Sequence, residues 1–359
     1  MKELYVISPN KYISPMLAKM VEVSTKGVNY TLVREVKNIE NLKDKKLLFV
    51  SQVTEIGSDI PMLEFLSQLI KKENHCLKGC TGGILIHSLN ENGTKRTAQD
   101  IIFTANNLGC EFIGHPVIEA ISTLENFLTW KKTLDLTLEE ICLKNSKELV
   151  ERLLEDKKLG FKNPKFLVLY SSPHKTSNTL DLWRMISKYL KGYDIKELLI
   201  EDGEVKDCHG CSYKLCSHYG KNNKCFYGGI MTEDVLPSIE AADIILWLCP
   251  NYNDAIAANL TAVINRLTVL YRQISFHKKL IFAVVVSGNS GSDSISKQLI
   301  GALNINKGFR LPPNFSIMAI ANDPLAIYQV EDIEEKSKTF AEVLLKEIKG
   351  ENFKIKNIE

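Results

Sequence analysis

Four of the nine cysteines lie close together in the sequence, at a spacing that suits metal binding. Cys208, Cys211, Cys216 and Cys225 fall within eighteen residues. Two thiolates separated by two residues can reach one metal centre, and the later pair would complete four ligands. A four-thiolate site holds either zinc or an iron–sulfur cluster, and the spacing does not choose between them. Four free thiols, or a redox-active CxxC pair, is the reading that needs no metal.

A second chemically suggestive segment, SSPHKTSNT, lies between an apolar run at 165–170 and a helical pattern. The start of a helix offers unpaired N–H groups and a positive dipole end, which favour a phosphate. The sequence contains neither GxxxxGK[ST] nor GxGxxG, so a monophosphate is favoured over a triphosphate or a dinucleotide. Ordinary helix capping would select the same residue types. The candidate phosphate ligands are Ser172, His174, Lys175, Ser177, Asn178 and Thr179.

Two more polar loops follow apolar runs in the same half of the chain. Ligands of open α/β sheets bind outside the carboxyl ends of the strands, so these loops should flank the phosphate site. An aromatic ring and amides in the first could flank a flat heterocycle, and small residues in the second allow close approach. Turn formation and surface packing are the alternative for each residue, but three such loops on one edge favour a cofactor site. The loops contribute Pro250, Asn251, Tyr252, Asn253 and Asp254, and then Ser287, Gly288, Asn289 and Gly291.

The elements that carry these loops read as a doubly wound α/β fold. In the second half, near-continuous apolar runs at 165–170, 194–200, 243–249, 280–287 and 314–321 alternate with helical patterns. Such runs are typical of parallel strands buried on both faces. The first half repeats the rhythm, with strands predicted at 4–8, 30–36, 46–51, 82–88 and 111–117. We therefore predict two parallel-sheet domains.

Gly160, Asn163 and Pro164 mark the expected boundary, which gives domains 1–160 and 161–359 with a Cys-rich insertion at about 203–230. The start of each half is similar, with SPNK at 8–11 and SPHK at 172–175, and this indicates an internal duplication. Nothing in the first half corresponds to Ser177–Thr179. We expect the first domain to bind no phosphate-bearing cofactor and to pack against the second as an internal pseudo-dimer partner.

Composition narrows the partners and the compartment. Lys and Arg number 45 against 43 Asp and Glu in 359 residues, so the net charge of +2 argues against nucleic acid or an anionic membrane as a partner. The N-terminal MKELYVISPNKY does not resemble a signal peptide, and the apolar runs are too short to span a bilayer. We expect a cytoplasmic protein with reduced thiols.

SSPHKTSNT, the cysteine cluster, AADIILWLCPNYND and VVVSGNSG together resemble the NADPH-dependent FMN reductase family of flavodoxin-like proteins, over roughly Lys165 to Phe315. Within that family they are most similar to the iron–sulfur flavoproteins of anaerobes. The resemblance implies two flavodoxin-like domains, FMN with its phosphate on the SSPHKTSNT loop, and the other two loops around the isoalloxazine. It also implies a 4Fe-4S cluster on the four cysteines, and a homo-oligomer.

The sequence departs from the family pattern in two places. Four residues, SYKL, separate Cys211 from Cys216 where iron–sulfur members have a compact CxxCxxC start. Asn259 and the pair Asn265-Arg266 stand where the family often has Lys and Asp-Arg.

The expected function is an FMN-dependent oxidoreductase with no catalytic side chain of its own. With a cluster, it would convert between two-electron flavin chemistry and one-electron carriers, with ferredoxin as a donor. Without one, it would be an NAD(P)H-dependent reductase of quinones, nitro compounds or free flavin. A zinc-stabilised, non-enzymatic binding module is the alternative from a different class.

Overall fold

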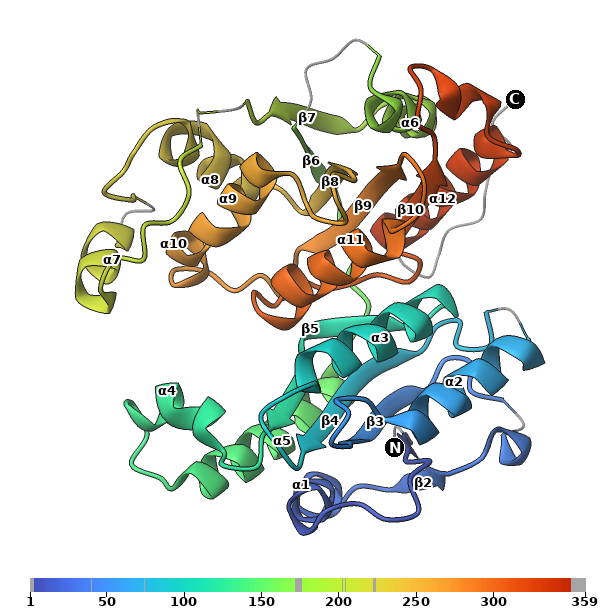
Figure 1. Cartoon of the computed structure of the whole chain (residues 1–359), viewed down its shortest axis with the longest axis vertical. Helices are drawn as coiled ribbons and strands as arrows, with labels where there is room; N and C mark the ends of the chain where they lie inside the picture. Colours follow the sequence, from blue (N-terminus) through green and yellow to red (C-terminus); the bar gives the residue numbers. More distant parts are fainter. Residues whose placement is uncertain are drawn as a thin grey trace. The chain divides into compact units, whose positions relative to one another are not determined.

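The computed structural model describes residues 3–39, 41–73, 75–171, 176–201, 203, 205–221 and 224–349. The chain divides into two compact units, Met1–Lys157 and Lys158–Glu359. Each unit is built on a five-stranded parallel sheet flanked by helices (Figure 1). Within the described ranges, no helix is both long and apolar enough to cross a membrane.

The first unit has the strand order β2-β1-β3-β4-β5, with every neighbouring pair parallel. Its central strands are buried along nearly their whole length, because helices cover both faces of the sheet. The longest helix begins at a capping box in which Thr137 and Glu140 satisfy each other's backbone N–H groups. The elements are β1 Leu4–Ile7, α1 Pro15–Thr25, β2 Tyr30–Val33, β3 Lys46–Val53, α2 Ile60–Lys72, β4 Thr81–Ser88, α3 Thr94–Asn107, β5 Glu111–Ala120, α4 Leu128–Lys131 and α5 Leu138–Glu155.

The second unit has the order β10-β9-β8-β6-β7, again all parallel. A π-helical turn, Met231–Val235, leads into α8, and a second, Ile300–Ile305, extends α11. The elements are β6 Lys165–Tyr170, α6 Asn178–Ser187, β7 Asp194–Leu199, α7 Tyr213–Gly220, α8 Leu236–Ala241, β8 Ile244–Pro250, α9 Ala258–Arg266, α10 Thr268–Tyr271, β9 Leu280–Ser287, α11 Ser292–Leu299, β10 Ser316–Ile320 and α12 Ile333–Lys349.

Counted from its own first strand, each unit has the order 2-1-3-4-5, which is the flavodoxin-like arrangement. The predicted fold class is therefore confirmed. In the second unit the connections leaving β6 and β8 run in opposite directions, and right-handed crossovers place their helices on opposite faces. A crevice forms at the carboxyl ends of β6 and β8, where the direction reverses. This is the place in the fold where a ligand of the second unit is expected.

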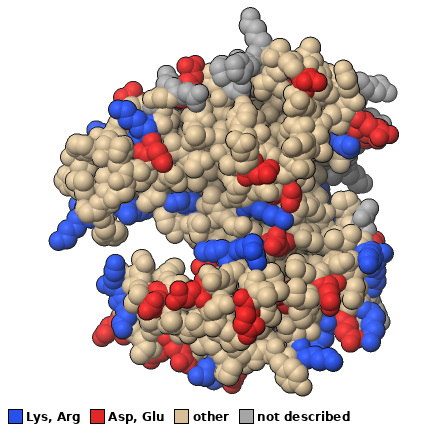
Figure 2. Space-filling model, viewed as in Figure 1, with Lys and Arg blue, Asp and Glu red and all other residues tan. Residues whose placement is uncertain are grey.

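Acidic and basic side chains are interspersed over the drawn face of the first unit, and no broad area of one sign covers it (Figure 2). This agrees with the near balance of charges along the chain.

Candidate cofactor site and cysteine cavity

A small cavity lies at the carboxyl ends of β6 and β8, where the strand order reverses. Its lining comes from the end of β6, the start of α6 and the end of β8. The Ser171 hydroxyl is buried there and has no hydrogen-bond partner within the described ranges. A buried hydroxyl without a partner costs free energy, so this atom is poised for an oxygen or nitrogen of a ligand. The cavity is lined by Tyr170, Ser171, Ser177, Thr179, Leu180, Leu248 and Pro250.

The predicted phosphate ligands divide into two groups. Ser172, His174 and Lys175 lie outside the described residues. Ser177 caps α6, since its Oγ accepts from Leu180 N at 3.4 Å. Asn178 at the same helix start is engaged elsewhere in the fold, because its Nδ2 donates to the backbone oxygens of Ala321 at 3.1 Å and Asp323 at 2.8 Å. Asn178 therefore ties α6 to the segment after β10, a role that the sequence pattern did not indicate.

Asn251 joins the loops after β8 and β9 into one connected structure. Its Nδ2 donates to Asp254 Oδ1 at 3.1 Å, to Ser287 Oγ at 3.0 Å and to Ser290 O at 3.0 Å. Its Oδ1 accepts from Asp254 N at 2.8 Å. The structure thus brings these two loops together, as the sequence predicts.

Two backbone features hold that loop pair in shape. Asn253 and Asp254 adopt left-handed backbone angles, with φ of 53° and 57°. Gly291 also has a positive φ of 90°, and a Cβ placed on it would lie 1.9 Å from Asp254 Oδ1. Tyr252 projects from the loop with 55% of its surface exposed, so its ring is available to cover a flat ligand. Gly288 and Asn289 are exposed at the start of the second loop.

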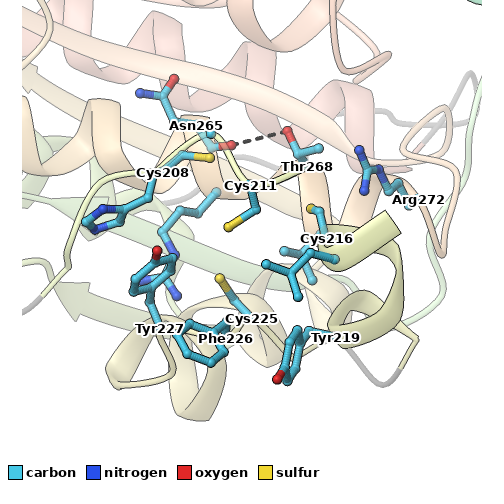
Figure 3. A pocket seen from close by; sticks show the side chains of 15 residues that line it. Cys208, Cys211, Cys216, Tyr219, Cys225, Phe226, Tyr227, Asn265, Thr268 and Arg272 are labelled. Carbon is cyan, nitrogen blue, oxygen red and sulfur yellow. Dashed lines mark hydrogen bonds between the residues drawn. The ribbon is translucent and has the colours of Figure 1, made fainter. Parts of the chain in front are cut away.

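The four cysteines of the insertion line a single cavity of about 120 Å³. It lies between α7 and the end of α9 with α10, and aromatic side chains form part of its wall (Figure 3). Tyr227 stacks on His209 with ring centroids 4.0 Å apart and meets Phe226 edge-on. The pKa of Tyr227 is raised, first by burial and then by the adjacent thiols, of which Cys211 has the largest effect. Sequence and structure therefore agree that Cys208, Cys211, Cys216 and Cys225 gather in one place.

Within the described part of the chain, no group of three or more His, Cys, Asp or Glu is arranged to hold a metal ion. Tetrahedral zinc requires four sulfurs about 2.3 Å from one point. The cysteines instead line a cavity. The described residues therefore support neither the zinc alternative nor the predicted iron–sulfur cluster.

Two arginines that are distant in sequence from the cysteines also line this cavity. Arg266 is 3% exposed, and its Nη1 and Nη2 donate to Lys206 O at 3.3 Å and Gly228 O at 3.1 Å. Its Nε has no partner among the described residues. Arg272 is exposed, and its guanidinium lies 4.8 Å from the centre of the Tyr213 ring.

Lys307 approaches the same cavity from the turn after the π-helical segment. Its Nζ donates to Thr268 Oγ1, a cavity-lining group, at 2.8 Å. The pKa of Lys307 is lowered, first by burial and then by repulsion from Arg272, while Cys208 and Cys216 oppose the shift. The sequence pattern does not connect Lys307 or either arginine with the cysteines, because only the folded chain brings these residues together.

The corresponding edge of the first unit is filled by a side chain of its own. Asp59, the N-cap of α2, is fully buried and accepts from Asn10 Nδ2 at 3.0 Å and from Ser51 Oγ at 2.8 Å. It also accepts from the backbone N–H groups of Gln52 and Met62 at 3.0 and 3.1 Å. Burial raises the pKa of this carboxyl, and the hydrogen bonds oppose the rise. The Asp59 carboxylate thus already accepts the hydrogen bonds between β1 and β3 that an anionic ligand would need.

Comparisons with known proteins return solved structures that are similar to this chain over about half of its length. An azoreductase from Bacillus anthracis str. Sterne is similar at 13% identity and a TM-score of 0.39, over 50% of this chain and 98% of that one. An NAD(P)H:quinone oxidoreductase from Methanothermobacter marburgensis is similar at 11% identity and a TM-score of 0.38, over 50% and 98% of the two chains. Among curated proteins, none matches the chain. Residues 164–323 match the model of the NADPH-dependent FMN reductase family, which confirms the resemblance seen in the sequence and indicates an oxidoreductase.

Proposed function

We propose that the chain is an FMN-dependent oxidoreductase that binds FMN at the carboxyl edge of the second unit's sheet. The FMN phosphate would lie at the start of α6, and the flavin ring between the loops after β8 and β9. The observation that carries this proposal is the buried, unpartnered Ser171 hydroxyl at the strand-order reversal. The family match over residues 164–323 supports the choice of FMN.

The residues present fit such a ligand. Ser171 supplies a hydroxyl, and the start of α6 supplies backbone N–H groups, of which that of Leu180 is already capped by Ser177. The Asn251 network fixes the shape of the two loops. Bound FMN supplies the redox chemistry, accepting electrons in pairs and passing them on singly or in pairs. The chain's own contribution is to orient the flavin and to cover it with Tyr252.

Replacing Ser171 by alanine tests the proposal. Removing a hydroxyl that lacks a partner should leave the free energy of unfolding of the apoprotein unchanged or slightly higher. If that hydroxyl binds FMN, the dissociation constant measured by quenching of flavin fluorescence should rise about 5- to 10-fold, for about 1 kcal/mol. Ser187→Ala, which removes an exposed hydroxyl bonded to Arg184 O, is the matched control. Equal affinity in both variants would remove the central support for the site.

The same titration tests the first unit. We propose that this unit binds no flavin, since Asp59 already takes up the donors between β1 and β3. One FMN per chain is the expected stoichiometry, and two would contradict this part of the proposal.

A second candidate function follows from the cysteine cavity, namely electron transfer through a 4Fe-4S cluster. Four cysteines around one cavity of about 120 Å³ are a donor set for a cluster, in which each thiolate binds a different iron. Bound there, a cluster would exchange single electrons with a carrier such as ferredoxin, whereas a cluster-free chain would take electron pairs from NAD(P)H.

Protein purified without oxygen decides between these two forms. Iron and acid-labile sulfide near four each per chain, with a broad visible absorption that dithionite bleaches, would support the cluster. Cys225→Ser should then lose that absorption, whereas Cys249→Ser, which alters a fully buried thiol, should keep it. A chain with FMN but without iron would favour the NAD(P)H-dependent reductase. A chain with zinc and no flavin would favour the binding module.

A further inference from the structure

We propose that Arg266, supported by Arg272 and Lys307, is the positive counter-charge of the cysteine cavity and sets the reduction potential of the centre held there. The inference rests on the cluster proposed above. It assigns a role to three residues that lie 41, 47 and 82 positions beyond Cys225. Arg266 is the principal member, and it acts through its positive charge.

The burial of Arg266 is the main evidence. Its side chain is 3% exposed, and its Nη1 and Nη2 each donate a hydrogen bond to a backbone oxygen. Backbone oxygens satisfy hydrogen bonds but do not neutralise the charge. Within the described ranges no carboxylate forms an ion pair with Arg266, although buried charges are normally paired. Nε is also left without a partner there.

The cavity that Arg266 lines is the natural source of the missing negative charge. Four cysteines surround it, and cysteines bind metal as thiolates. A centre ligated by four thiolates is anionic, and its charge would lie against the buried guanidinium. The unpaired Nε and the four-thiolate donor set are independent observations that point to the same occupant.

Arg272 and Lys307 add to the positive side of the balance. Arg272 lines the cavity and donates to Ser217 Oγ at 3.3 Å. Lys307 donates to Thr268 on the cavity wall, and its ammonium lies 5.3 Å from the centre of the Tyr271 ring. The opposing carboxylate at the rim is Asp207, which accepts from Cys208 N and, at 2.8 Å, from Asn265 Nδ2. Among the described residues, Arg266 and Arg272 thus line the cavity with the four cysteines, Lys307 contacts its wall, and the Asp207 carboxylate opposes them.

The physical consequence concerns the reduced state. Reduction by one electron adds one negative charge to the centre, and a nearby cation stabilises that charge. The stabilisation is larger for a buried cation than for an exposed one, and salt screens it less. Loss of Arg266 should therefore lower the reduction potential at any ionic strength. Loss of Arg272, which is exposed, should lower it less, and the effect should fade in high salt.

The test is a potentiometric titration with dithionite, followed by electron paramagnetic resonance at low and high salt. Iron and sulfide are counted first in each protein. We expect Arg266→Gln to shift the potential downward at both salt concentrations, and Arg266→Lys to return most of the shift by restoring the charge. Arg272→Gln should show a smaller shift that high salt removes. Lys278→Gln removes an exposed cation that does not line the cavity and should show no shift.

The outcomes separate this inference from the proposal beneath it. Wild-type protein without iron or sulfide overturns the cluster and the inference together. A full cluster in Arg266→Gln with an unchanged potential overturns the inference alone, as does an equal shift in Arg266→Lys. If Arg266→Gln does not fold, Lys307→Met serves as the test, because the reduction potential of the centre should also fall in that variant. An unchanged potential in that variant would overturn the inference.

Discussion

Replacing Gly291 by alanine tests whether the loops after β8 and β9 must fit together for FMN to bind. Gly291 has a φ of 90°, and a Cβ there would lie 1.9 Å from Asp254 Oδ1, so Asp254 must move. Gly192 is a matched control because its φ is 91° and a Cβ there meets nothing within 4 Å. Alanine in a left-handed conformation costs about 1–2 kcal/mol, and this cost is common to both variants.

The difference between the two variants isolates the collision. The Cβ would also lie 3.0 Å from Asn251 Nδ2, so two side chains must shift, which disrupts the hydrogen bonds from Asn251 Nδ2 to Asp254 Oδ1, at 3.1 Å, and to Ser290 O, at 3.0 Å. At about 1 kcal/mol each, Gly291→Ala should lose about 2 kcal/mol more than Gly192→Ala. If the loop pair forms the flavin site, the FMN dissociation constant should rise about 30-fold in Gly291→Ala, whereas Gly192→Ala should bind as the wild type does.

Two measurements check this reasoning on the same proteins. Chemical unfolding gives the difference in the free energy of unfolding, and flavin fluorescence gives the dissociation constant. A 2 kcal/mol difference in stability with equal FMN affinity would show that the loops support each other but do not form the flavin site. Equal stability would show that the loop absorbs the Cβ without moving Asp254.

Three further predictions concern groups away from the flavin. Asp59→Asn should lower the free energy of unfolding of the first unit by about 2–4 kcal/mol, because the amide leaves buried donors without acceptors. The affinity for FMN should not change, and a loss of affinity would contradict the proposal that only the second unit binds FMN. Burial lowers the pKa of His87 below its usual 6.5, so the unfolded chain binds its proton first and stability should fall as the pH drops through 6.5. Urea unfolding at pH 7.5 and 5.5 should show a smaller fall in His87→Gln, and parallel curves would refute the assignment. Ellman's reagent should react rapidly with four thiols of the folded, iron-free chain and slowly with the five buried thiols. Burial raises the pKa of three of the buried thiols to about 12 and raises the pKa of the other two as well. Rapid reaction of more than four thiols would contradict the burial of Cys76, Cys80, Cys110, Cys142 and Cys249.

The parts of the fold that depend on local pattern were predictable from the sequence. Strands such as β8 and β9 are unbroken apolar runs because both faces are covered, and this signal survives without any knowledge of the neighbouring elements. The gathering of Cys208 and Cys225 was predictable for a similar reason, since both lie in one short segment. The adjacency of the loops after β8 and β9 followed from the strand order that the fold class implies.

The parts that depend on tertiary contacts were not predictable. Arg266 and Lys307 reach the cysteines only because α9 and the turn after α11 pack beside the insertion. Asn178 sits in a motif that suggests a phosphate, yet its amide binds the backbone near Ala321, 143 residues away. A charged or amide side chain gives no periodic signal of its partner, so one sequence alone cannot assign these contacts.

The hydrogen bonds of Asp59 limit how a second flavin site could be engineered into the first unit. Copying SSPHKTSNT onto the loop after β1 would place a phosphate against a carboxylate that four donors already hold. Removing Asp59 first would leave those donors without an acceptor and would destabilise the start of α2, which Asp59 caps. Each change, the new loop or the removal of Asp59, is harmful alone. A second cofactor site therefore requires both changes at once, so that the phosphate takes the place of the Asp59 carboxylate as the acceptor of these hydrogen bonds.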